Sequence, residues 1–188
     1  TPSNSSAASD VYKRQIFYVI TTLGNAGWFW IVLAVLMLTV LPKKYKKAGL
    51  TMAIALILSL IFCNGIMKHL WARPRAFWVV GQNFVVGNEF ENLYGIFNSI
   101  HDYSFPSGHS SASFAAAVSI FMWRKKEGSA ALVLAALIAF SRLYFTVHYP
   151  TDVLVGTITG ALYGVAAYFI VKALMNKVPK LNAIFNKQ

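Results

Sequence analysis

Acidic residues are scarce in this chain of 188 residues, which contains 6 Asp and Glu against 17 Lys and Arg. Charged residues together make up only 12% of the sequence, where about 25% is usual, whereas hydrophobic residues make up 57%. So little charge excludes an ordinary soluble domain and indicates a membrane protein of about one domain. Cys63 is the single cysteine, which excludes an intrachain disulfide and a thiolate metal site.

Basic residues give the chain a net charge of +11, a value that would suggest a nucleic-acid partner in a soluble protein. Here they follow apolar stretches in clusters that fall on the same side of a membrane, which is the positive-inside pattern. We therefore expect no nucleic-acid partner, and we expect the basic loops and the C-terminus in the cytoplasm. The clusters comprise Lys43, Lys44, Lys46 and Lys47, then Arg124, Lys125 and Lys126, then Lys172, Lys177, Lys180 and Lys187.

Long apolar stretches predict an all-α fold, an integral membrane helical bundle with about five spanning helices. The stretches are residues 16–41, 48–71, 106–123, 129–147 and 153–174.

The same pattern divides the chain into three parts. Residues 16–176 are expected to form the membrane-embedded domain, residues 1–15 a disordered or artefactual tail, and residues 177–188 a cytoplasmic tail. The long connection over residues 72–105 is rich in Gly, Asn and aromatic residues. We interpret it as a structured cap or an interfacial segment.

Glycines mark two of the apolar stretches. Gly24, Asn25 and Gly27 interrupt the first one. In the last stretch, glycines recur every fourth residue and so share one helical face, which lets a neighbouring helix approach closely. We interpret this ladder, which comprises Gly156, Gly160 and Gly164, as a packing feature.

Cationic side chains and a helix start are expected to meet at the outer membrane face. Lys68, Arg75 and Arg142 offer the positive charges and hydrogen-bond donors that bind a phosphate dianion. Ser107 and Gly108 open a helix, whose backbone N–H groups and dipole also favour an anion. Together these groups predict a phosphate pocket.

Two histidines are expected near the same pocket, one as the nucleophile and the other as the proton donor. Asp152 follows His148 by one helical turn and can accept one ring N–H, which leaves the other nitrogen free to attack phosphorus. His109 lies beside the predicted phosphate site and can protonate the leaving oxygen.

The shortage of acids also bears on metals. The outer face offers only Glu89, Glu91, Asp102 and Asp152, which do not form a cluster suited to Mg²⁺ or Zn²⁺. We therefore expect a mechanism without a metal or another cofactor. Asp102, with His101, is expected to shape the loop before the helix that starts at 106.

Three groups of these residues resemble, in order and spacing, the three signatures of the type-2 phosphatidic acid phosphatase (lipid phosphate phosphatase) superfamily. The resemblance covers about residues 20–175. The groups are Lys68 with Arg75, Phe-Pro-Ser-Gly-His at 105–109, and Ser141-Arg142 with His148 and Asp152.

The resemblance implies that His148 is the nucleophile that forms a phosphohistidine, that Asp152 orients it and that His109 is the general acid. It also implies metal-independent, vanadate-sensitive catalysis. Residues expected to hold the phosphoryl oxygens are Lys68, Arg75, Ser107, Gly108 and Arg142.

The first signature departs from the family pattern. The family has Arg-Pro where this chain has Arg75-Ala76, and Arg73-Pro74 lies two residues too close to Lys68. We assign the phosphate to Arg75 because its spacing fits, with Arg73 as second choice. The usual member also has six spanning helices, so the equivalent of the first is expected to be absent or reduced to the residues before Gly24.

Overall resemblance to bacterial undecaprenyl pyrophosphate phosphatases makes undecaprenyl pyrophosphate the first expected substrate, at the outer face of the bacterial inner membrane. Phosphatidylglycerophosphate or phosphatidate is the alternative, because the signatures recognise the phosphate and not the tail. A membrane anion-binding or transport protein without turnover is the alternative of a different class. The sequence predicts neither the tail specificity nor the oligomeric state.

Overall fold

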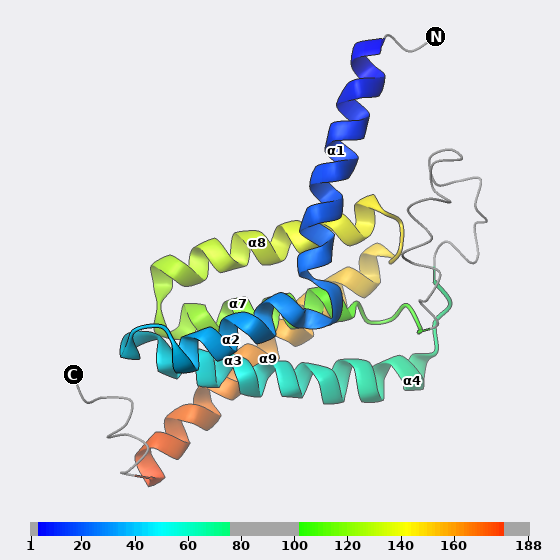
Figure 1. Cartoon of the computed structure of the whole chain (residues 1–188). Coiled ribbons are helices and arrows are strands. Elements are labelled where there is room, and N and C mark those ends of the chain that lie inside the picture. The colour runs from blue at the N-terminus through cyan, green and yellow to red at the C-terminus, as the bar shows by residue number, and fades with distance from the viewer. Residues whose placement is uncertain (1–3, 76–101, 179–188) are drawn as a thin grey trace.

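Helices form every regular element of the residues that the structure describes, 4–75 and 102–178, in a computed structural model (Figure 1). This confirms the all-α fold class. Along the chain the elements are α1 (Asn4–Leu23), η1 (Asn25–Gly27), α2 (Trp28–Thr39), η2 (Lys43–Tyr45), α3 (Lys46–Leu58), the π-helical η3 (Ser59–Met67), α4 (Lys68–Trp71), α7 (Gly108–Trp123), α8 (Lys125–Tyr144) and α9 (Pro150–Lys177).

Three continuous helical stretches of the described chain are long and apolar enough to cross a membrane, namely Lys43–Trp71, Lys125–Tyr144 and Pro150–Lys177. A fourth span results if α1 and α2, bent by 45° where they meet, count as one. The fifth expected span corresponds to α7, whose 16 residues are fewer than the roughly 20 that a span needs.

α7 lies at the centre of the bundle, in contact with α3, α8 and α9. Its buried face consists of small residues, chiefly Ser and Ala. The glycine ladder of α9 faces it, because a Cβ at Gly160 would lie 2.2 Å from the Ser111 carbonyl oxygen and one at Gly156 would lie 2.6 Å from that of Ser107. The packing interpretation of the ladder is therefore confirmed.

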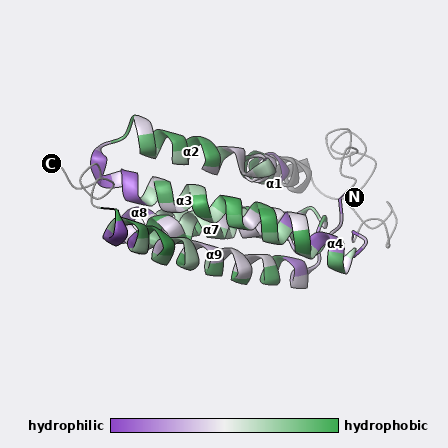
Figure 2. Cartoon of the chain, turned by 90° about the horizontal axis from the view of Figure 1, so that it is seen from below, coloured by the Kyte–Doolittle hydropathy of each residue, from purple (hydrophilic) through white to green (hydrophobic). Residues whose placement is uncertain are grey.

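The bundle has a basic end and an opposite end that carries the predicted site. The α2–α3 turn, the α7–α8 turn and the end of α9 lie together, whereas α4, the start of α7, the end of α8 and the start of α9 lie at the other end (Figure 1). Hydrophilic residues gather at these two ends and hydrophobic residues follow the helices between them (Figure 2). The predicted site residues that the structure describes therefore share one end.

Two parts of the chain differ from the sequence prediction or lie outside the structure. Residues 4–15, expected as a tail, are the first turns of α1. Most of the expected cap falls on residues 76–101, and most of the expected cytoplasmic tail falls on 179–188; both lie outside the described residues.

Candidate active site

His148 lies in the short connection between α8 and α9, where the chain turns sharply. Three backbone hydrogen bonds hold this turn: carbonyl oxygens in the last turn of α8 accept the N–H groups of Phe145, Thr146 and Val147. Thr146 has a φ of 50°, which is unusual for a residue with a branched side chain. This turn buries the His148 side chain just outside the membrane-spanning helices.

The two ring nitrogens of His148 face different partners. Nδ1 lies 3.6 Å from Asp152 Oδ2, and the Ser104 hydroxyl bridges the two at 3.4 Å from the ring nitrogen and 2.5 Å from the carboxylate. Nε2 lies 3.3 Å from Arg75 Nη1. A proton on Nδ1 therefore suits the carboxylate side and leaves the Nε2 lone pair toward the cation.

Burial lowers the pKa of His148 to about 4, although the hydrogen bond to Asp152 acts in the opposite direction. The positive charges of Arg142, Arg75 and Lys68 lower it further. The ring is therefore neutral at physiological pH, as a nucleophile has to be.

Asp152 is completely buried in the first turn of α9, where its carboxylate is held on several sides. Oδ2 accepts the backbone N–H of Tyr149 at 3.0 Å, and Oδ1 accepts a hydrogen bond from Arg73 at 2.8 Å. Arg73 also donates to Thr151 and stacks over the Tyr149 ring at 3.9 Å. Arg73 thus binds the start of α9, whereas Arg75 lies beside the histidine.

Lys68 and Arg75 share one counterion, Asp102. Each cation bonds a different oxygen of the Asp102 carboxylate, and Arg75 Nε also donates to the Asp102 backbone carbonyl at 3.0 Å. Burial would raise the pKa of Asp102, but hydrogen bonds and charges from Lys68 and Arg75 outweigh this effect and hold it below its ordinary value. The half-exposed carboxylate bridges two cations as a phosphate would.

Arg142 lies buried in the last turn of α8 and donates a hydrogen bond to the Thr21 hydroxyl of α1 at 2.6 Å. Its backbone carbonyl accepts the N–H of Val147, so Arg142 and the His148 turn belong to one local structure. This turn therefore sets how Arg142 and His148 lie relative to each other.

The start of α7 carries the second predicted signature. The Ser107 hydroxyl caps the helix by accepting from the Ser110 N–H at 3.4 Å, and the Ser107 N–H is donated to the Asp152 carbonyl at 3.0 Å. That N–H, expected to face an anion, is therefore engaged between helices. Gly108 lies against the amide of Asn64, since a Cβ there would lie 2.7 Å from Asn64 Oδ1.

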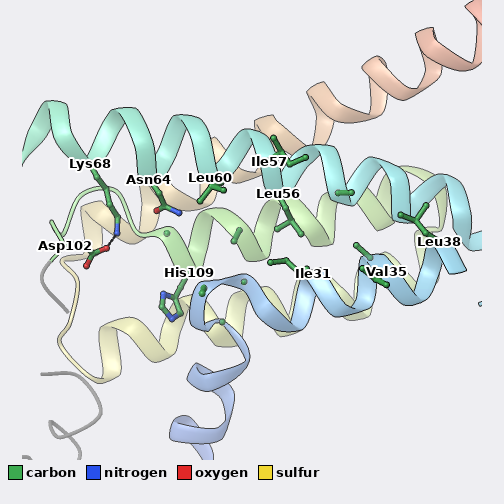
Figure 3. A pocket seen from close by; sticks show the side chains of 17 residues that line it. Ile31, Val35, Leu38, Leu56, Ile57, Leu60, Asn64, Lys68, Asp102 and His109 are labelled. Atoms are coloured by element: carbon green, nitrogen blue, oxygen red, sulfur yellow. Dashed lines mark hydrogen bonds and ion pairs between the residues drawn. The ribbon is translucent and has the colours of Figure 1, made fainter. Parts of the chain in front are cut away.

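A cavity of about 640 Å³ opens between α2 and α3 over α7. At one end it is lined by polar groups, including Lys68, Asp102, Asn64 and His109, and from there apolar side chains of α2 and α3 follow it along the helices (Figure 3). Such a shape, polar at the head and apolar along its length, suits an amphiphile.

Sequence reasoning missed several members of the site. Ser104 immediately precedes the Phe-Pro-Ser-Gly-His signature, and this adjacency was the only signal for it. Asp102 was expected to shape its loop and not to bridge Lys68 and Arg75. Asn25, whose amide oxygen lies 2.9 Å from His109 Nε2, was expected only to interrupt an apolar stretch. His101, Glu89 and Glu91 lie outside the described residues.

The chain matches the family model of the PAP2 superfamily over residues 44–176. It is 30% identical over 167 residues to a protein of Escherichia coli K12 provisionally named undecaprenyl-diphosphatase (YbjG). The aligned region covers 88% of this chain and 73% of that protein. It is 29% identical to an undecaprenyl-diphosphatase of Sulfolobus acidocaldarius over 71% of this chain and 59% of that protein.

Solved structures show the same fold. The crystal structure of Aquifex aeolicus LpxE has a TM-score of 0.59 and 23% sequence identity, covering 81% of this chain and 82% of LpxE. A PAP2-type phosphatidylglycerolphosphate phosphatase of Bacillus subtilis has a TM-score of 0.58 and 22% identity, covering 94% and 89% of the two chains. The chain is therefore a member of the PAP2 superfamily, a multi-pass membrane phosphatase of lipid phosphates.

Proposed function

We propose that the chain hydrolyses a lipid phosphate or diphosphate at the outer face of the bacterial inner membrane, through a phosphohistidine on His148. The observation that carries this proposal is the pair of contacts on the His148 ring. Ser104 and Asp152 hold Nδ1, whereas Nε2 faces Arg75, a cation able to bind phosphate.

In the first step, His148 Nε2 attacks phosphorus and the bond from phosphorus to the leaving oxygen breaks. His109 gives that oxygen a proton, and Asp152 stabilises the cationic ring that forms. In the second step, His109 takes a proton from water, whose oxygen attacks the phosphohistidine. The N–P bond breaks and releases inorganic phosphate with neutral His148.

Three cations, Lys68, Arg75 and Arg142, would stabilise the negative charge on the phosphoryl oxygens. Lys68 and Arg75 already bridge a carboxylate, and a substrate phosphate would take the place of Asp102 between them. Arg142 acts on His148 electrostatically from the end of α8. Arg75 is preferred over Arg73 because Arg73 bonds the Asp152 carboxylate and Thr151.

Undecaprenyl diphosphate is the first candidate substrate, and it would yield undecaprenyl phosphate and inorganic phosphate. The names of the Escherichia coli and Sulfolobus relatives support it. Other relatives are lipid A 4'-phosphatases of Bacteroides thetaiotaomicron and Porphyromonas gingivalis, so a different lipid phosphate is the second candidate. The basic end of the bundle supports an extracytoplasmic site by the positive-inside rule.

The test is phosphate release by the purified full chain in detergent from undecaprenyl diphosphate, phosphatidylglycerophosphate and phosphatidate, side by side. We expect the highest kcat/KM on undecaprenyl diphosphate and loss of release in His148→Ala. Equal release by the wild type and His148→Ala would contradict the enzymatic mechanism. A higher kcat/KM on another lipid would contradict only the choice of substrate.

A further inference from the structure

The break between α1 and α2 lies against the predicted general acid, and the phosphatase chemistry above gives it no role. In the sequence, Gly24, Asn25 and Gly27 appear only as interruptions of an apolar stretch. In the structure, the Asn25 amide oxygen lies 2.9 Å from His109 Nε2. The two residues are 84 positions apart in the chain, so the contact is made by the fold.

The backbone around Asn25 is shaped to reach His109. Gly24 carries no Cβ, and one built there would lie 2.7 Å from His109 Cδ2 and from Ile138. Only a glycine lets this segment lie so close to the imidazole. The break is therefore fitted to the ring and does more than end a helix.

The residues after Asn25 adopt a conformation that L-residues rarely take. Ala26 has φ 48° and Gly27 has φ 69°, two consecutive left-handed residues. For alanine this conformation is unfavourable, and such residues persist where the surrounding structure requires them, often at functional sites. The turn directs the chain into α2 and leaves the Asn25 side chain on His109. Gly24, Ala26, Gly27 and His109 all line the cavity that begins at Lys68 and Asp102 (Figure 3).

We propose that Asn25 is a positioning residue for His109, whose Nε2–H it accepts so that Nδ1 is the nitrogen that exchanges a proton with the leaving oxygen. An amide oxygen can accept this N–H from both the neutral and the cationic ring. It therefore holds one orientation and one tautomer through both steps of the reaction. This inference rests on the proposed role of His109.

The experiment compares kcat/KM on phosphatidate, a lipid phosphate whose leaving group is an alcohol, and on p-nitrophenyl phosphate for the full chain in detergent. For both substrates kcat/KM reports the steps up to departure of the leaving group, and only the alcohol of phosphatidate has to be protonated as it leaves, because p-nitrophenolate is a stable anion. Asn25→Ala is expected to lose roughly tenfold on the lipid and little on p-nitrophenyl phosphate. Asn25→Asp, which keeps an accepting oxygen, is expected to restore most of the loss.

Thr22→Ala is the matched control, because Thr22 lies in the same segment and its hydroxyl bonds the Val19 carbonyl of its own helix at 2.7 Å. It is expected to leave both rates near wild type. If Asn25→Ala lowers both substrates equally, or neither, or if Asn25→Asp does not restore activity, the inference is wrong. ¹⁵N spectra of the imidazoles add a readout independent of turnover, since neutral His109 should carry its proton on Nε2 in the wild type and lose that preference in Asn25→Ala.

His109→Ala separates this inference from the proposed function. If His109→Ala itself lowers both substrates equally, the acid role of His109 fails, and the proposal for Asn25 fails with it. If His109→Ala loses the lipid substrate selectively and Asn25→Ala does not, only the role of Asn25 is contradicted.

Discussion

At the scale of single residues, the proposed mechanism depends on a buried histidine, His148, that lies between the Asp152 carboxylate and Arg75. His148 keeps its Nε2 lone pair because burial lowers the pKa of the ring more than the hydrogen bond to the Asp152 carboxylate raises it. A solvent-exposed imidazole would be partly protonated near neutral pH and would lose that fraction of nucleophile. The motif predicted the pair of His148 and Asp152, but the bridging hydroxyl of Ser104 depends on a fold that joins two distant segments.

The titration of His148 tests this environment. We expect its ring in the substrate-free protein to titrate well below 6.5, near pH 4, in ¹⁵N spectra assigned with a His148→Ala variant. Because the folded pKa is depressed, the unfolded chain binds the extra proton first, so stability is lost as pH falls from about 6.5 toward 4. A His148 ring that titrates at or above 6.5 would contradict a buried neutral nucleophile.

Asp102 offers a second prediction at this scale. Its carboxylate occupies the position between Lys68 and Arg75 that a phosphate would take, so Asp102→Asn is expected to bind anions more tightly. The expected gain in vanadate affinity is about two- to fivefold, because a half-exposed ion pair contributes up to about 1 kcal/mol.

The control for this measurement is Glu127→Gln, which removes the partner of Arg124 near the basic end of the bundle. Vanadate affinity should not change in that variant. Weaker vanadate binding in Asp102→Asn would mean that Asp102 orients Arg75 for the phosphate instead of occupying its place.

At the scale of elements, the sequence predicted the features that depend only on local periodicity and composition. Apolar runs predicted the helices near 48–71 and 153–174, and a four-residue repeat predicted the glycine ladder. The structure contains all of them. The break at Gly24 to Gly27 was visible, but its partner was not, because His109 lies on a helix far along the chain. The π-helical η3 before Lys68 left no signal in composition.

The close contact of α7 with α9 predicts the effect of a single methyl group. In Gly160→Ala the new Cβ would meet the Ser111 backbone at 2.2 Å, so the helices have to separate. We expect a loss of about 1 to 3 kcal/mol of stability, seen as a lower thermal midpoint in detergent. Gly65→Ala is the matched control, because its Cβ would make an ordinary contact with the Leu60 carbonyl oxygen at 3.6 Å. Equal midpoints for the two variants would contradict the packing role of the ladder.

At the scale of the whole molecule, the apolar cavity reaches one side of the site. Lys68, Asp102 and His109 line its polar end, and the apolar part follows α2 and α3 (Figure 3). The family signatures in the sequence predicted a lipid phosphate as substrate. The sequence could not predict the cavity, whose walls come from segments far apart in the chain and whose shape depends on their separation.

Filling the cavity should affect only substrates with long tails. Leu56→Trp places a larger side chain in the apolar part, so kcat/KM on undecaprenyl diphosphate is expected to fall roughly tenfold. The rate on p-nitrophenyl phosphate should stay near wild type. Leu162→Trp, at an exposed position of α9 outside the cavity lining, is the control and should change neither rate. A similar loss in both variants would exclude the cavity as the site of the tail.

The central claim is that His148 carries the phosphoryl group, and the most direct measurement is to trap it. The purified chain would be mixed with lipid substrate labelled in its terminal phosphate, quenched in alkali within the first turnover, and digested for mapping. We predict an alkali-stable, acid-labile phosphohistidine at position 148 that forms as fast as the lipid product and is absent from His148→Ala. Turnover without a phosphorylated intermediate, or with label on another residue, would contradict this mechanism.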